Sequence, residues 1–130
     1  MKWYLMAWKR YADFEGRASR MEYWMFTLIH AVIFLALEVA FLALSALHLS
    51  AIGIPLFLAC FIYALAAIFP GLSVSVRRLH DLGKSGWWML FALVPLGAFI
   101  LMVFFTFGSE PGSNQYGLGP KPAAPAAITG

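Results

Sequence analysis

Charged residues are scarce in this sequence, and their scarcity argues against a soluble domain. Only 12% of the 130 residues are Asp, Glu, Lys or Arg, whereas 62% are hydrophobic. Soluble domains are about half apolar and about a quarter charged, because polar groups must cover their surface. We therefore expect lipid to be the solvent for most of this chain, which is short enough for one domain.

Cysteine is nearly absent, and histidine is sparse. Cys60 is the single cysteine, so no internal disulfide can form, and its apolar surroundings predict an inert buried thiol. His30, His48 and His80 fall at three different depths of the expected helices, so they do not form a metal site. We predict no metal, no cofactor and no nucleic-acid partner.

Three long apolar segments predict an all-α integral membrane protein with three transmembrane helices. The expected spans cover about residues 23–47, 53–82 and 86–107. A helix over the first of them would rise ~37 Å, enough to cross a hydrocarbon core of ~30 Å. The short connection at Leu47–Ser50 makes the first two helices antiparallel neighbours. Pro70 predicts a kink in the second span or a boundary between two elements.

Two local signals predict where these helices begin and end. Ser19 followed by Glu22 has the spacing of a capping box, which predicts a helix starting at Arg20. Gly83 suits the left-handed residue that follows the end of a helix, so the second span should stop beside it.

The two ends of the chain differ from the spans. Residues 1–14 predict an amphipathic helix lying at the membrane interface. One face of this helix is formed by residues that recur at helical spacing, namely Tyr4, Ala7, Trp8 and Tyr11. Residues 108–130 are rich in Gly and Pro and have no periodicity, which predicts a flexible, turn-rich tail after a membrane domain over residues 1–107.

The basic residues predict the orientation in the membrane. With three spans, eight of the nine Lys and Arg residues lie on one side, and Lys121 alone lies on the other. Basic residues concentrate on the cytoplasmic side of membrane proteins. We therefore expect a cytoplasmic amino terminus and a periplasmic carboxyl terminus.

A charged cluster is expected where the first span begins and the second ends. Its cations are Arg17, Arg20, Arg77, Arg78 and Lys84, supported by Glu22, His80 and Asp81. An acid near a helix C-terminus is disfavoured by the helix dipole, so Asp81 should have an arginine partner within its helix or across helices. Two interpretations stay open: the arginines only anchor the topology, or the cluster binds anionic lipid headgroups or an acidic partner.

Two polar residues, His30 and Glu38, interrupt the first span. A carboxyl group inside the hydrocarbon is costly and should be neutral and hydrogen-bonded to protein. Counting along the antiparallel second span places Tyr63 at the depth of Glu38, so we predict a hydrogen bond between them. The alternative is a proton or ion path through Glu38 and His30 in a small oligomeric transporter or channel.

Catalytic motifs are weak. His80 and Asp81 are adjacent on a helix and do not face each other, and no Ser or Cys nucleophile accompanies them. Gly83-Lys84-Ser85 lacks the first glycine and the preceding strand of a phosphate loop. An enzyme acting on a lipid headgroup therefore ranks third, behind a non-enzymatic binding module and a transporter subunit.

Three blocks carry a family resemblance. Tyr11–Phe26, Ser75–Trp88 and Pro111–Gly117 resemble the small bacterial inner-membrane proteins catalogued as domain of unknown function 805, the YhaH-like family. The resemblance covers nearly the whole chain. It implies a multi-pass protein of the bacterial inner (plasma) membrane with about three spans, and it brings no established activity. Membrane lipids are the expected partners, with a homo-oligomer or a partner membrane protein as open alternatives.

Overall fold

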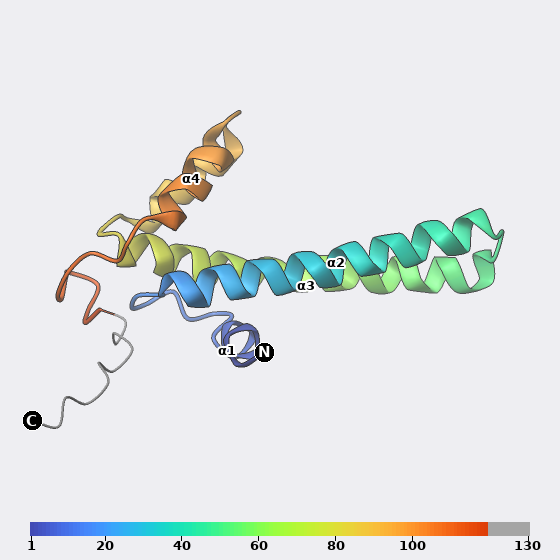
Figure 1. Ribbon diagram of the computed structural model, residues 1–130, viewed down its shortest axis with the longest axis horizontal. Coiled ribbons are helices and arrows are strands. Elements are labelled where there is room, and N and C mark those ends of the chain that lie inside the picture. Colours follow the sequence, from blue (N-terminus) through green and yellow to red (C-terminus); the bar gives the residue numbers. More distant parts are fainter. Residues whose placement is uncertain (120–130) are drawn as a thin grey trace, which may run out of the picture. The chain divides into compact units, whose positions relative to one another are not determined.

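The computed structural model describes residues 1–119, which form helices joined by turns and irregular segments, with one isolated bridge between Asn114 and Gly117. The elements are α1 (Lys2–Lys9), α2 (Arg20–Ala46), α3 (Ser50–Asp81), the 3-10 helix η1 (Gly86–Leu93) and α4 (Gly97–Thr106) (Figure 1). The all-α fold class is confirmed for this part of the chain. The chain forms two compact units: Met1–Asp13 with Trp24–Val74, and Phe14–Tyr23 with the residues from Ser75 onward.

In the first unit, α2 and α3 lie side by side and run in opposite directions (Figure 1). The ring centroids of Phe41 and Phe57 are 5.3 Å apart, and a Cβ atom on Gly71 would lie 3.8 Å from the Phe26 ring. The helices contain 27 and 32 residues, so each is long and apolar enough to cross a membrane. Most of their outward side chains are exposed and apolar, as lipid contact requires.

The structure agrees with the predicted start of α2 and the predicted end of α3, whereas α3 begins at Ser50 and not at the expected residue 53. Ser19 Oγ accepts the Glu22 amide at 3.1 Å, and α2 begins at Arg20. Gly83 adopts φ 74°, and the amides of Gly83 and Lys84 donate to the carbonyls of His80 and Leu79, which closes α3 as a Schellman motif. A side chain at position 83 would also collide with the Glu110 carboxylate. Between these ends, α3 continues through Pro70 as one helix.

Helix α1 packs within the first unit. Tyr4 and Ala7 are buried, and the Tyr4 ring stacks on Phe26 with centroids 5.5 Å apart. The Tyr4 hydroxyl lies 2.7 Å from the Tyr63 hydroxyl. The helix ends at Lys9, earlier than the predicted residue 14. Its placement at a membrane interface stays a prediction.

The structure differs from the prediction of one continuous helix over residues 86–107. The segment is a helical hairpin whose arms, η1 and α4, are joined at Val94–Leu96. Pro95 lacks the N–H that a continuing helix would use, Val94 is extended, and Leu96 adopts φ 66°. Among the described residues, α2 and α3 are the helices long enough to span, so a third transmembrane helix is not confirmed.

Gly97 allows the two arms to meet. A Cβ atom on Gly97 would overlap the carbonyl oxygen of Phe91. Because the obstacle is backbone, Gly97→Ala should lower the free energy of unfolding by about 1–3 kcal/mol. Gly108→Ala, where nothing lies within 4 Å of an added Cβ, is the matched control. Thermal unfolding of the two purified variants in detergent tests this, and an unchanged Gly97→Ala protein would contradict the close approach.

Candidate functional site

A buried ionic network lies where α2 begins and α3 ends, in the second unit. We call it the ion network, and its members are Arg17, Glu22, Arg77, Arg78 and Asp81. Arg77, Arg78 and Asp81 have 0% exposure, Arg17 has 8% and Glu22 has 4%. Five ionisable side chains are therefore withdrawn from solvent together, which is favourable only when they are paired and hydrogen-bonded.

Asp81 is the centre of the ion network. Its Oδ1 atom accepts a bond from Arg17 Nε at 3.0 Å. Its Oδ2 atom accepts from Arg78 Nη1 and from the Ser109 hydroxyl. The prediction that Asp81 has an arginine partner is confirmed, and the carboxylate has one within α3 and one from the loop before α2.

Arg17 and Arg78 also bind main-chain carbonyls at the end of α4 and in the segment that follows it. Arg78 Nε and Nη2 donate to Phe105 O at 3.3 and 3.2 Å, and Nη2 also donates to Phe107 O. Arg17 donates to Glu110 O at 2.6 Å and to Gly112 O at 2.7 Å. A planar guanidinium provides several donors in fixed directions, and an ammonium group does not. These bonds hold the chain after α4 against the end of α3.

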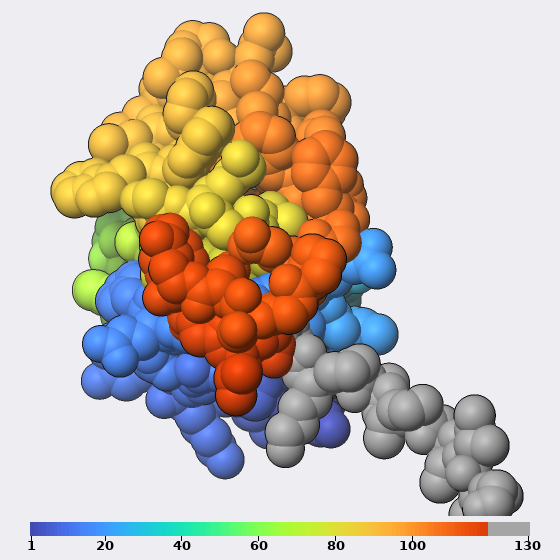
Figure 2. Space-filling model, turned by 90° about the vertical axis from the view of Figure 1, so that its left-hand side faces the viewer, coloured from blue at the N-terminus to red at the C-terminus, as the bar shows by residue number. Residues whose placement is uncertain are grey.

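Residues 110–117 lie beside the end of α3, and Figure 2 shows this segment in red against the yellow segment that includes that end. The Asn114 amide donates to His80 O at 2.9 Å, and the Tyr116 ring stacks on His80 with centroids 3.9 Å apart. His80 Nδ1 donates to Gly16 O at 3.1 Å. The predicted flexibility of 108–130 stays a prediction, and residues 120–130 lie outside the described part.

The ion network contains buried donors without a partner, on Arg77, and a surplus of positive charge. The Nη1 atom of Arg77 pairs with Glu22, but the buried Nε and Nη2 atoms of Arg77 have no partner among the described residues. A buried donor without a partner costs about 1–3 kcal/mol. The ion network also contains three arginines against two carboxylates. One positive charge is therefore not neutralised within it.

Two of the predicted cations lie outside the ion network. Arg20 is exposed, and its Nη1 atom reaches Thr106 O at 3.4 Å. Lys84 is half-buried, with its ammonium 4.5 Å from the Trp88 ring centroid and 5.1 Å from that of Phe104. Neither forms an ion pair within residues 1–119. The predicted cluster thus divides into three buried arginines and two accessible cations.

A shallow cavity of about 210 Å³, open to the surface, is formed by residues that follow Lys84 in the sequence. It is lined by Ser85, Trp87, Trp88 and Phe91. The Ser85 hydroxyl oxygen accepts the Trp87 amide at 3.2 Å, so its proton is left to donate elsewhere. The cavity therefore has one polar group and an apolar floor. The sequence drew attention to the Trp pair as an interfacial anchor but gave no sign of a cavity.

The predicted hydrogen bond between Glu38 and Tyr63 is wrong. The Tyr63 hydroxyl lies 2.8 Å from His30 Nδ1 and 2.7 Å from the Tyr4 hydroxyl. Glu38 is half-buried, and its side chain has no hydrogen bond among the described residues. The prediction compared the depths of residues in α2 and α3 only. It therefore missed the hydrogen bond from Tyr4, which comes from α1.

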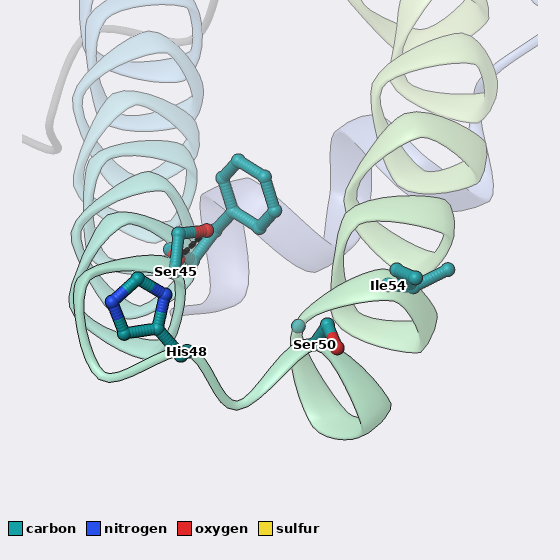
Figure 3. Close-up of a pocket in the computed structure, with 6 residues that line it drawn as sticks. Ser45, His48, Ser50 and Ile54 are labelled. Atoms are coloured by element: carbon teal, nitrogen blue, oxygen red, sulfur yellow. Dashed lines mark hydrogen bonds between the residues drawn. The ribbon is translucent and has the colours of Figure 1, made fainter.

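A second cavity, of about 340 Å³, lies at the turn between α2 and α3 (Figure 3). Its lining includes Ser45, His48, Ser50 and Ile54. The Ser45 hydroxyl donates to Phe41 O at 2.8 Å, and His48 adopts φ 55° at the turn. Within residues 1–119, no group of three His, Cys, Asp or Glu side chains could hold a metal ion.

The described residues form an all-helical fold whose two long apolar helices are consistent with a membrane protein. The chain belongs to the family described as "Protein of unknown function (DUF805)", which it matches over residues 11–118. It is 43% identical over 122 residues to inner membrane protein YhaI of Escherichia coli strain K12, covering 93% of this chain and 97% of that protein. It is 38% identical over 122 residues to inner membrane protein YhaH of the same strain, covering 93% and 98%. No solved structure matches.

These comparisons confirm the predicted family. The named relatives are inner membrane proteins, and the two apolar helices of this chain fit the same location.

The guanidinium of Arg78 makes bonds that lysine cannot reproduce. Arg78→Lys keeps the charge but loses at least one charge-assisted bond to Asp81, Phe105 or Phe107. We expect the free energy of unfolding in detergent to fall by about 2 kcal/mol or more. Arg20→Lys, at the exposed arginine, should change it by less than about 0.5 kcal/mol. Equal stability of the two variants would mean that Arg78 supplies only charge.

Proposed function

We propose that this chain is a non-enzymatic membrane module that binds an anionic lipid where α2 begins and α3 ends. The phosphate of the lipid is held by Lys84, and its glycerol and upper acyl region lie in the neighbouring cavity. The position of Lys84 carries the proposal: this cation is not used by the ion network, and its ammonium lies over the ring of Trp88, which lines the neighbouring cavity.

The surroundings of Lys84 favour an anionic ligand. Its ammonium is half-buried over two aromatic rings and has no carboxylate partner in residues 1–119. A partly desolvated cation gains more from a nearby anion than a fully hydrated one. The rings also hold the side chain in place, which reduces the conformational entropy lost on binding.

The cavity beside Lys84 suits the rest of a phospholipid. Ser85 offers a hydroxyl proton at the polar end, and Trp87, Trp88 and Phe91 offer apolar surface. Indole rings prefer the level of the headgroups in a bilayer. A ligand that joins a phosphate to a hydrocarbon chain matches this order of groups.

The ion network supports the same assignment through its charge. Its three arginines outnumber its two carboxylates by one, and Arg20 adds an exposed cation at the start of α2. No Lys or Arg lies in the connection between α2 and α3, so the basic residue rule favours the cytoplasm for the face with these cations. Anionic lipid headgroups of that leaflet are attracted to such a surface.

This assignment revises the expected roles of the arginines. Arg17, Arg77 and Arg78 are buried and engaged in the ion network, so they act on a lipid only through the charge and the shape that they maintain. An acidic protein partner would use the same accessible cations without the apolar cavity. Retention of lipid by the purified protein separates these two ligands.

Native mass spectrometry after detergent exchange tests the proposal on protein loaded with phosphatidylglycerol or phosphatidylethanolamine. The wild type should retain the anionic lipid preferentially. Lys84→Gln should weaken that retention about tenfold, because one charge-assisted contact is lost, whereas Lys84→Arg should keep it. Lys9→Gln removes the same charge from an exposed position of α1 and should have little effect.

The salt dependence of lipid retention is a second test of the proposal. Retention by the wild type should fall as salt rises, because screening weakens the attraction between the ammonium and the phosphate. Equal retention by Lys84→Gln and Lys9→Gln would overturn the assignment of Lys84. A wild type without preference for the anionic lipid would overturn the proposed function and leave the acidic partner as the alternative.

A further inference from the structure

The hairpin of η1 and α4 has no place in the expected three-span topology. We propose that it is a monotopic insertion in a single leaflet, the one at whose face α3 ends, and that acyl chains cover its apolar surface. The segment that follows α4 then lies on the same side of the membrane as the start of α2. This inference does not rest on lipid binding at Lys84.

Neither arm is long enough to cross a bilayer. The eight residues of η1 extend ~16 Å and the ten residues of α4 extend ~15 Å. The hydrocarbon core is ~30 Å thick. Each arm therefore covers about the depth of one leaflet.

Both ends of the hairpin are fixed at the end of α3. The first arm follows the Schellman turn at Gly83 after a short connection. The second arm returns to Arg78, which donates to the carbonyls of Phe105 and Phe107. The Ser109 hydroxyl then binds Asp81. A chain that leaves and returns at one point on α3 cannot end on the opposite side of the membrane.

The surface of the hairpin indicates what covers it. No charged residue occurs between positions 86 and 107. Large apolar side chains are exposed on η1, at the tip and on α4, with 78% exposure at Trp87, 83% at Leu93 and 65% at Phe99. A protein partner would cover one face, whereas acyl chains cover a hairpin all round. Lipid is therefore the occupant that fits this distribution.

The turn leaves few backbone donors without a partner. Pro95 has no N–H to satisfy, and the amides of Val94 and Gly97 donate to Phe91 O at 3.1 Å and Val94 O at 2.9 Å. Backbone donors inside a bilayer must be satisfied by the protein, because no water is available there. The distribution of basic residues also agrees with this topology. None of the nine Lys and Arg residues lies in the connection between α2 and α3.

Cysteine labelling tests the topology. In a Cys60→Ala background, the exposed positions Ala12, Ser50 and Ser113 are changed to Cys one at a time. A membrane-impermeant maleimide is applied to intact spheroplasts and to lysed cells. We expect Ser113→Cys to label from the same side as Ala12→Cys and from the opposite side to Ser50→Cys. Labelling of Ser113→Cys from the side of Ser50→Cys would overturn the inference.

Fluorescence quenching tests the covering by lipid. Leu93→Cys and Ser113→Cys, each carrying bimane in the same background, are reconstituted in vesicles. Nitroxide on the acyl chains should quench bimane at position 93 at least twofold more than at position 113, and aqueous iodide should show the reverse order. Iodide quenching at position 93 equal to that at 113 would place the tip in water and overturn the lipid assignment.

Discussion

The carboxylate of Asp81 is the group on which the second unit depends. It accepts bonds from Arg17, Arg78 and Ser109, so three segments of the chain meet at two oxygen atoms. Removing one partner of a buried ion pair costs about 3–5 kcal/mol, because the remaining charge is left in an apolar environment. The Schellman turn at Gly83 then directs the chain so that the Glu110 amide reaches the Asp81 carbonyl at 2.9 Å.

Features set by neighbouring residues were predictable from the sequence. The capping bond of Ser19 and the stop at Gly83 follow from signals within one or two turns, and the helices α2 and α3 follow from their long apolar runs. The break at Pro95 was not predicted, because an apolar stretch of membrane length looks the same whether it is one helix or two short arms. The two arms can pack together only because Gly97 has no side chain. This contact between the arms cannot be read from the sequence.

The sequence predicted which residues belong to the candidate site. It did not predict which of them are buried in the ion network and which remain accessible. The sequence placed the arginines together and required a partner for Asp81, but it could not show that Arg17 and Arg78 bind main-chain carbonyls after α4 and at its end. Any residue can provide such a carbonyl, so no pattern of side chains predicts these hydrogen bonds. Once these arginines are engaged, Lys84 and Arg20 are the accessible cations of the predicted set, and the proposed lipid site moves to Lys84.

The central claim is that a buried ion pair joins the loop before α2 to the end of α3. A double-mutant cycle with Arg17→Gln, Asp81→Asn and the double variant measures this coupling from unfolding of the purified protein in detergent. The account predicts a coupling energy of about 1.5 kcal/mol or more, because Arg17 and Asp81 share a direct buried bond. Single effects that add to within about 0.5 kcal/mol would contradict it.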